Sequence, residues 1–571
     1  MQTSSENADK PRGVEPGELE STGCSSTADH LRNASSVATM LRVSLWVAFA
    51  AWHTTFDEGF AGTVLIMPSY QKAFGTCHQR MDLALGYIVE ECSLTPLQQS
   101  LISLNYLFIG IGGGLSALTG KYTGRRGAIQ IGCTLAVVGA AGMLGTGDGS
   151  RHTFLHYMVC KCIGALGLGQ LISASLAYGS ECIFASKRGL GLGIYNVGLA
   201  FGNLSSAAVC AGSARLEPDN NWQWKIPILA QIPLGIILGV GILLLPESPR
   251  WILNNDENGE EEARKAFSLL YRIPANSPEI TSQIADVKAH IKAERANAAA
   301  STWYEIYSKP HFRRTWTSAL IMIGLSITGI QFVQPYAALF LQGVGIHDPY
   351  LINVIIGLCI LGGACLGPFI VEHAGRRFAI LSGYTAMGIC MLILSAVSSA
   401  LGSGDISQIV VVVFLCLWSF VFGGTIAPSA GLAAVEMHSV RLRTYGQAHT
   451  TSLYGIFSFG AIFWTPYMLN KDYGNMGPNV GYFYAAVTVV IGVLAYLLVP
   501  ETAGLTLEQI DDVFNSGVRP WKTSIQRNKV IVRTKNQELL EGHSPTTEEE
   551  EVEQQEDEKR NERPKPSIEM S

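Results

Sequence analysis

Asp57 is the side chain of this sequence whose surroundings most clearly point to chemistry. It lies within a long apolar run near residues 41–67. Placing a charged carboxylate at the centre of a membrane span costs roughly 3 kcal/mol on insertion scales. Such a group must be paired with a cation or take up a proton. An acid poised between those two states can couple the entry of a proton to the movement of another solute.

Arginine and glutamate side chains form a second pattern, which occurs twice in the same order. Gly124-Arg125-Arg126 returns as Gly375-Arg376-Arg377, at an offset of roughly 250 residues. The other repeated parts are Glu181 with Glu436, Arg188 with Arg443, and Pro246-Glu247-Ser248 with Pro500-Glu501-Thr502. This repetition indicates that one half of the chain has been duplicated.

The elements that must hold these residues are apolar runs of about 20 residues, the length that crosses a bilayer. The 571 residues are 48% hydrophobic and only 15% charged, with sixty glycines and a mean hydropathy of +0.24, which excludes an ordinary soluble enzyme. We place twelve runs. They lie near residues 41–67, 97–120, 127–147, 153–179, 190–211, 226–245, 315–342, 350–371, 378–400, 406–434, 445–469 and 480–499.

The sequence therefore predicts an all-α membrane protein of two pseudo-symmetric bundles with six helices each. Duplicated membrane halves are the usual construction of a secondary transporter, whose substrate site lies between the halves near the bilayer midplane. The predicted organisation is a disordered N-terminus (1–40), a first bundle (41–246), a linker with amphipathic helices (247–314), a second bundle (315–500) and a tail that is acidic and disordered at its end (501–571).

Basic residues in the short loops predict the orientation. They follow the second, fourth, eighth and tenth runs, whereas the loops on the other side hold fewer bases and several acids. By the positive-inside rule the basic loops are cytoplasmic. Both termini and the linker are then cytoplasmic too. The first run follows some forty polar residues, so we expect a membrane anchor and not a cleaved signal peptide.

The remaining composition argues against other chemistry. Of the twelve cysteines, Cys77 and Cys92 alone fall in a long external loop, where either a disulfide or two free thiols is compatible with the spacing. Glycine-rich stretches at 110–114 and 164–169 lie inside the apolar runs, where small residues permit close helix packing, and no Walker motif is found. We expect no enzyme, cofactor, metal or nucleic-acid partner, and energy from a gradient.

These motifs together resemble the sugar porters of the major facilitator superfamily, over about residues 41–520. In order, the family carries an Asp in its first span, Gly-Arg-Arg after the second, a basic residue before glycines in the fourth, Glu then Arg-Gly, and Pro-Glu-Ser-Pro-Arg after the sixth. This chain matches with Asp57, Gly124-Arg125-Arg126, Lys161 before Gly164, Glu181 with Arg188-Gly189, and Pro246-Glu247-Ser248-Pro249-Arg250. The stretches 222–227 and 465–470 further resemble the α-glucoside and lactose permease branch.

The resemblance gives Asp57 and Lys161 a shared role. In proton-coupled sugar porters the first-span Asp takes the proton, and a fourth-span Arg is its switchable partner. Lys161 stands at that Arg position, so it lacks the bidentate guanidinium and is itself more easily deprotonated. The alternative is a static ion pair between Asp57 and Lys161.

The duplicated charges would then act as a cytoplasmic gate, because in the family such groups form ion pairs that close the inner side and break when it opens. The alternative, anchoring by positive charge alone, leaves the glutamates unexplained. Lys121 replaces the Asp that the family has before the first Gly-Arg-Arg. The predicted gate residues are Arg125, Arg126, Glu181, Arg188, Glu372, Arg376, Arg377, Glu436 and Arg443.

Planar amides and aromatic rings suit the hydroxyl pairs of a sugar. Asn196 and Asn203 lie seven residues apart on one helical face, at positions where the family contacts sugar. Several hexose contacts of the family are replaced, for example by Leu325, Ser326 and Gly431. The predicted substrate-binding residues are Asn196, Asn203, Gln331, Gln334, Tyr336 and Tyr454.

Proton-coupled uptake of a sugar or glycoside across the plasma membrane is therefore the expected function, with the lipid bilayer, protons and a small-molecule substrate as partners. One alternative stays open. The same scaffold can carry a non-sugar metabolite, because fold does not fix function. A nutrient sensor would need a long structured tail, and the residues after Val518 have a disordered composition.

Overall fold

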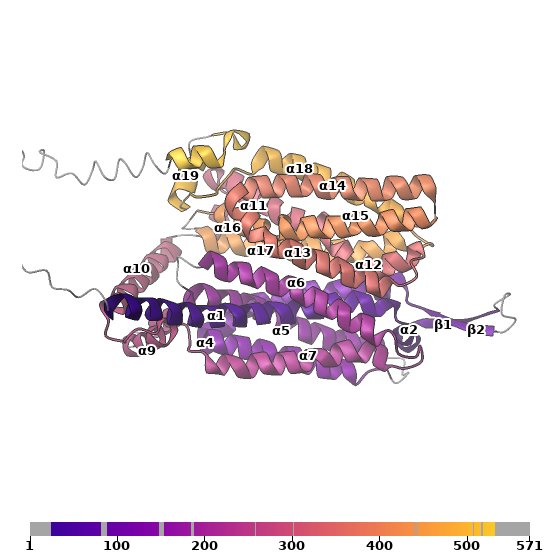
Figure 1. The fold of residues 1–571 in the computed structure, drawn as a ribbon, viewed down its shortest axis with the longest axis horizontal. Helices are drawn as coiled ribbons and strands as arrows, with labels where there is room; N and C mark the ends of the chain where they lie inside the picture. Colours follow the sequence, from indigo (N-terminus) through magenta and orange to yellow (C-terminus); the bar gives the residue numbers. More distant parts are fainter. Residues whose placement is uncertain are drawn as a thin grey trace, which may run out of the picture.

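Helices account for nearly all of the regular structure. This is expected of membrane spans, because no water is available in the bilayer core to form hydrogen bonds with the backbone. The computed structural model describes residues 24–531, apart from 82–87, 148–152, 184–187, 257–258, 301, 403, 440–441, 506 and 516–517. Two bundles of roughly parallel helices lie side by side, the first half of the chain forming one and the second half the other (Figure 1). This is the predicted two-bundle architecture.

The first bundle holds the repeated residues of the N-terminal half. Its long helices are α1 (Cys24–Thr63), α4 (Leu104–Leu144), α5 (Thr153–Cys182), α6 (Arg188–Ser213) and α7 (Trp222–Gly241). Helix α1 begins upstream of the predicted start at residue 41, so part of the stretch 1–40 that we expected to be disordered is helical. Helix α4 contains both the second and the third predicted spans. The two spans meet at a kink at Gly124, where φ is +80°.

The second bundle is built from α11 (Lys309–Ile327), α12 (Ile330–Val344), α13 (Pro349–Ala374), α14 (Arg376–Leu401), α15 (Asp405–Gly424), α16 (Ile426–Glu436), α17 (Arg443–Leu469) and α18 (Val480–Leu498). Two predicted spans are interrupted here. The run 315–342 breaks at Gly329, where φ is +123°, and the run 406–434 breaks at Thr425. Discontinuous helices of this kind line substrate sites in transporters.

Nine stretches of the described residues are long and apolar enough to cross a membrane. One of them, Pro96–Leu144, contains two predicted spans because of the reversal at Gly124. Helices α1 and α17 are not among the nine. Helix α1 carries His53, Asp57 and Glu58, and α17 carries a polar run from His449 to Ser452. Counting the divided stretch twice and adding these two helices gives the twelve predicted spans.

The two ends of the bundles are covered by different elements (Figure 1). The hairpin end carries α2 (Pro68–Phe74), the antiparallel strands β1 (Thr76–Met81) and β2 (Ile88–Ser93), and α3 (Pro96–Ser100). Cys77 pairs with Cys92 in the register of these strands, and a disulfide joins them. The other end holds the repeated arginine and glutamate motifs and is called the cassette end below. It carries α8 (Pro249–Asn255), α9 (Glu260–Tyr271), α10 (Pro278–Ala300) and α19 (Leu507–Asn515).

Single-turn segments of 3-10 helix connect these elements. They are η1 (Val64–Ile66), η2 (Leu101–Ser103), η4 (Ile242–Leu244), η5 (Trp303–Tyr307), η7 (Gly477–Asn479) and η8 (Pro520–Lys522). Glycine-rich stretches bring α4 and α5 into close contact. A Cβ at Gly112 would lie 2.1 Å from the carbonyl oxygen of Leu166, and one at Gly169 would lie 2.0 Å from that of Ile109. These glycines therefore serve helix packing, as their location in apolar runs indicates.

Candidate functional site

Asp57 and Lys161 form a buried ion pair inside the first bundle. Both residues are 3% exposed, and the Lys161 ammonium donates to Asp57 Oδ2 at 2.7 Å and to the Asp57 carbonyl oxygen at 3.2 Å. Its nitrogen also lies 4.4 Å from the centre of the Phe60 ring, one turn further along α1. The structure thus brings together the two residues predicted for proton coupling, one from α1 and one from α5.

Glu58 is a second acid at the same depth, and it is not among the predicted site residues. It follows Asp57 on α1 and is partly accessible, so it faces a different side of the helix. The Tyr106 hydroxyl on α4 donates to Glu58 Oε2 at 3.5 Å, and the Gln334 amide on α12 lies close enough to interact. An acidic residue directly after Asp57 was the available signal. Its orientation depends on the packing of α1 and could not be read from the sequence.

Polar side chains of the second bundle gather where α11 gives way to α12. Gln331 donates to Ser458 Oγ at 3.0 Å and to the Tyr454 hydroxyl at 3.4 Å. The Ser458 hydroxyl donates to Ser326 Oγ at 3.1 Å. Within the described part of the chain, Oε1 of Gln331 is buried and has no hydrogen-bond partner. An acceptor of this kind can bind a hydroxyl group of a solute.

The other predicted substrate residues lie along the interface between the bundles. Asn196 and Gln334 are partly accessible. Asn203 faces α13, since its Oδ1 would lie 3.5 Å from a Cβ at Gly357. Tyr336 is fully buried, and its hydroxyl contacts the carbonyl oxygens of Gln99 and Ile462 at 3.1 and 3.2 Å. In this conformation Tyr336 joins the two halves and does not face an open cavity.

Several contacts join the two bundles at the hairpin end. Three side-chain hydrogen bonds between the halves lie there. They are Asn353 Nδ2 to Thr63 Oγ1 at 3.1 Å, Ser100 Oγ to the Phe463 carbonyl at 2.7 Å, and the Tyr336 hydroxyl to the Gln99 carbonyl. Gly62 on α1 also meets the main chain of Pro335 on α12. The hairpin end is therefore closed.

At the cassette end, the predicted gate residues of the first half form one cluster. Arg125 donates to both carboxylate oxygens of Glu181, at 2.7 and 3.1 Å, and the Ser248 hydroxyl donates to the same carboxylate at 2.6 Å. The carboxylate of Glu247 accepts from the main-chain N–H groups of Arg125 and Arg126, at 2.9 and 3.2 Å. This carboxylate caps the helical segment that begins after Gly124.

The second half repeats this cluster with the equivalent residues. Arg376 donates to Glu436 at 3.3 Å, and the Thr502 hydroxyl donates to Glu436 at 2.6 Å. The Glu501 carboxylate accepts from the N–H groups of Arg376 and Arg377, at 3.0 and 3.1 Å. Gly124 and Gly375 both have a positive φ, and a Cβ at either would collide with the capping carboxylate. The duplication seen in the sequence is thus a duplicated structural unit.

The remaining gate residues differ in their placement. Arg126 donates to the Leu243 carbonyl at 3.0 Å, and Arg377 donates to the carbonyls of Tyr496 and Val499. Glu372 is exposed. Arg443 begins α17 and is partly buried, whereas the side chain of Arg188, at the start of α6, lies outside the described part of the chain. The contacts described for each cluster join helices of one half.

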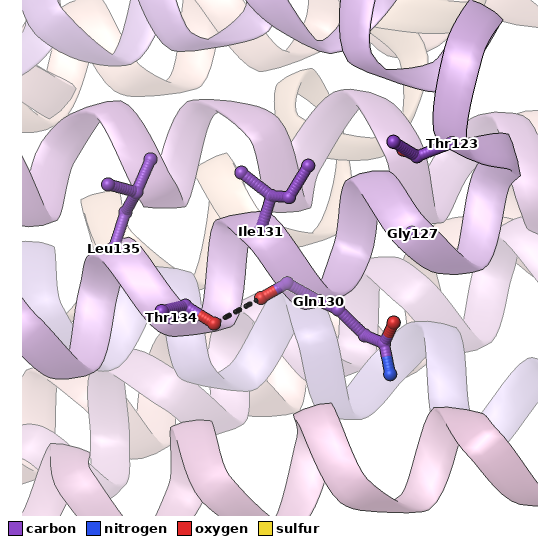
Figure 2. Close-up of a pocket in the computed structure, with 6 residues that line it drawn as sticks. All are labelled: Thr123, Gly127, Gln130, Ile131, Thr134 and Leu135. Atoms are coloured by element: carbon purple, nitrogen blue, oxygen red, sulfur yellow. Dashed lines mark hydrogen bonds between the residues drawn. The ribbon is translucent and has the colours of Figure 1, made fainter.

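A hollow of about 460 Å³ on α4 is separate from this site (Figure 2). It is lined by Thr123, Gly127, Gln130, Ile131, Thr134 and Leu135. The Thr134 hydroxyl donates to the Gln130 carbonyl, and the Gln130 amide points away from the helix (Figure 2). None of these residues belongs to the predicted site. The described residues also contain no group of histidine, cysteine and acidic side chains suited to a metal ion.

Comparisons with known proteins agree with this geometry. The chain is 26% identical to a high-affinity fructose transporter of Schizosaccharomyces pombe over 87% of this chain and 91% of the relative. It is 28% identical to a high-affinity glucose transporter of the same yeast, over 84% and 88%. A hexose transporter of Saccharomyces cerevisiae is 25% identical, over 84% and 83%. These relatives favour a sugar over a non-sugar substrate.

Solved structures with the same fold include the xylose transporter XylE of Escherichia coli. Its partially occluded inward-open conformation matches with a TM-score of 0.67 at 17% identity, over 82% of this chain and all of that chain. The proton:xylose symporter XylE bound to 6-bromo-6-deoxy-D-glucose matches with a TM-score of 0.65, over 84% and 100%. The chain therefore has the fold of the major facilitator superfamily.

Residues 43–514 match the model of the family described as sugar (and other) transporter. This match covers the ion pair, the polar cluster and both charged clusters. It identifies a multi-pass membrane protein that transports and does not catalyse a chemical reaction. The chain belongs to the sugar (and other) transporter family.

Proposed function

We propose that this transporter takes up a sugar or glycoside together with protons by alternating access. One observation carries the proposal: the buried Asp57–Lys161 pair of the first half lies next to Glu58, which reaches groups of the second half. Ionisable side chains inside membrane spans mark proton relays and substrate paths. We therefore expect a change of charge at the proton site to affect the polar cluster across the interface between the halves.

The proposed sugar site lies between the two halves at the depth of the α11–α12 break. Gln331 and Tyr454 contribute side chains to this site from the second half, with Gln334 nearby. Asn196 and Asn203 contribute side chains from the first half. Gln331 has an unused acceptor, and its amide also donates, so it suits a pair of hydroxyls. The relatives that transport fructose, glucose and hexoses support this class of substrate.

We assign the cassette end to the cytoplasm. It carries Arg125, Arg126, Arg376 and Arg377, as the positive-inside rule requires, and the Cys77–Cys92 disulfide at the opposite end suits an oxidising exterior. The closed hairpin end then makes this conformation inward-facing. Both termini lie in the cytoplasm, and the plasma membrane is the proposed location.

Alternation requires the contacts at the hairpin end to break and new contacts to form at the cassette end. The charged clusters lie where those new contacts must form. In the outward-facing state, we expect their arginines and glutamates to meet across the halves and close the cytoplasmic side. Lys121, which replaces an acid in the first cluster, makes the N-terminal half of this closure weaker.

Uptake by cells that lack their own sugar carriers tests the function directly. A radiolabelled panel of monosaccharides, disaccharides and polyols should reveal concentrative uptake of at least one sugar, abolished by a protonophore. External acidification should increase the rate, and addition of the sugar should make the medium more alkaline. Uptake of no sugar, with efflux of another metabolite, would replace the proposal with export of a non-sugar solute.

A further inference from the structure

The centre of the first bundle holds two acids and one base. Asp57 and Lys161 neutralise each other, and the ammonium is held by two oxygens of Asp57 and by the face of Phe60. Glu58 is left over. An unpaired charged carboxylate at the centre of a membrane span costs roughly 3 kcal/mol. Glu58 must therefore share Lys161 or bind a proton.

The surroundings of Glu58 supply no second cation among the described residues. Six helices contribute the titratable and polar groups that lie near it. These groups are Asp57 on α1, Lys161 on α5, Tyr106 on α4, Tyr195 on α6, Tyr454 on α17 and the amide of Gln334 on α12. Lys161 is the sole cation in this set, and it is already bonded to Asp57.

Accessibility separates the two acids further. Asp57 is 3% exposed and closed off by Lys161, whereas Glu58 is partly accessible and meets residues of both halves. A proton that enters along the interface between the halves reaches Glu58 first. The protonated carboxyl can donate one hydrogen bond, and the ionised form can only accept. A change of protonation at Glu58 therefore changes the hydrogen bonds offered to Tyr106 and Gln334.

We propose that Glu58 is the group that carries the transported proton, with Asp57 as the standing counter-ion of Lys161. In the outward-facing state, an O–H bond forms on Glu58 with a proton from outside. In the inward-facing state, this bond breaks and the proton passes to cytoplasmic water. Lys161 stays protonated throughout. This inference rests on the proposed proton-coupled uptake and names the residue that performs it.

The direct test uses the purified full-length protein in proteoliposomes. Glu58→Gln keeps the Asp57–Lys161 pair and removes the carboxyl. We expect the variant to lose sugar-driven proton movement and accumulation, so that the internal sugar concentration only equals the external one, while counterflow exchange continues. Glu217→Gln, which alters an exposed acid on the hairpin end, should accumulate sugar like the parent.

Two results would overturn the inference, and they are distinguishable. If the parent and Glu58→Gln both move protons with sugar, the proton lies elsewhere and only this inference fails. If the parent moves sugar without protons, the proton-coupled function fails, and the inference fails with it.

Infrared difference spectroscopy provides a second test that does not depend on transport. Mild acidification of the purified protein, from about pH 8 to about pH 6 where exposed carboxyls stay ionised, should produce the carbonyl band of a protonated carboxyl, which Glu58→Gln lacks and Glu217→Gln retains. Glu58→Asp, which keeps a carboxyl at this position, should retain both the band and the coupling. Persistence of the band in Glu58→Gln would assign the proton to another acid.

Discussion

Lys161 holds Asp57 by its side chain and its main chain at once, with 2.7 Å to Oδ2 and 3.2 Å to the carbonyl oxygen. The pair connects α5 to α1 within one half, so rocking of the halves does not by itself pull it apart. Removing one partner of such a buried pair costs about 3–5 kcal/mol, because the other charge stays uncompensated. Here the loss of Asp57 leaves Glu58 as a substitute partner, which reduces that cost.

Asp57→Asn should therefore fold but lose uphill transport. The substitution leaves Lys161 and Glu58 to neutralise each other, so no proton is bound and the pH dependence of uptake disappears. Exchange of sugar across the membrane, measured by counterflow, should stay partly active. Accumulation and proton movement equal to those of the parent would show that the charge balance among Asp57, Glu58 and Lys161 does not control proton binding.

Gln331→Ala and Asn196→Ala should each raise the apparent KM for the transported sugar. Each change leaves a substrate hydroxyl unpaired, at a cost of roughly 1 to 3 kcal/mol, and about 1.4 kcal/mol corresponds to a tenfold loss of affinity. Surface expression should be preserved. The matched control is Gln342→Ala, which removes an exposed amide near the end of α12. Parental kinetics in both test variants would make the two amides packing residues.

The sequence predicted the spans well because a membrane helix satisfies its own backbone and needs only length and apolarity. The charged clusters were also predictable, since the duplication placed Arg125 and Glu181 in the same order as Arg376 and Glu436. Their partners within each half were not. The hydroxyls of Ser248 and Thr502 complete the two clusters through tertiary contacts that no sequence spacing specifies.

The centre of the molecule was harder to predict. The break at Gly329 depends on a positive φ, and a glycine in an apolar run is equally typical of close packing. Tyr336 illustrates the same limit, because its hydroxyl meets main-chain carbonyls of α3 and α17 at the interface. Which face of a helix meets the other half is decided by packing between the halves.

Gly62→Ala should prevent closure of the hairpin end. An added Cβ would lie 1.6 Å from the Pro335 carbonyl oxygen, so α1 and α12 must move apart. The population should shift toward the outward-facing state, and a cysteine replacing the fully buried Ser100 should react faster with an external maleimide. The control is Gly110→Ala, whose Cβ meets no atom within 4 Å. Equal labelling in the two backgrounds would contradict the assignment of this contact to closure.

His438 should make the folded protein less stable in mild acid. It lies between α16 and α17 with 4% exposure, and burial, aided by His449 and Arg443, lowers its pKa from 6.5 to about 4. Between these values the unfolded chain binds a proton that the folded protein does not. The stability is therefore fully present above pH 6.5 and is lost as the pH falls toward 4, by roughly 3 kcal/mol at most.

Thermal unfolding in detergent measures this effect. The melting temperature of the parent should fall between pH 7 and pH 4.5, and it should fall less in His438→Asn. The substitution of the exposed His347 by Asn should leave the pH dependence of the parent unchanged. An identical pH dependence in His438→Asn would show that this histidine does not contribute.

Neutralising Glu181 and Glu436 together should move the resting population further toward the inward-facing state. Each acid holds an arginine at the cassette end, Arg125 with two hydrogen bonds and Arg376 with one. If these groups also close the cytoplasmic side in the outward-facing state, their loss removes a closing interaction from that state alone, and the equilibrium shifts by the same free energy.

Cysteines placed beside Arg188 and Arg443 should then react faster with a cytoplasmic reagent in Glu181→Gln/Glu436→Gln than in the parent. Glu261→Gln, on the exposed face of α9, serves as the control, with a side chain that is 84% exposed. Equal rates in all three proteins, each correctly inserted, would leave the clusters with a structural role inside each half and no part in closing the gate.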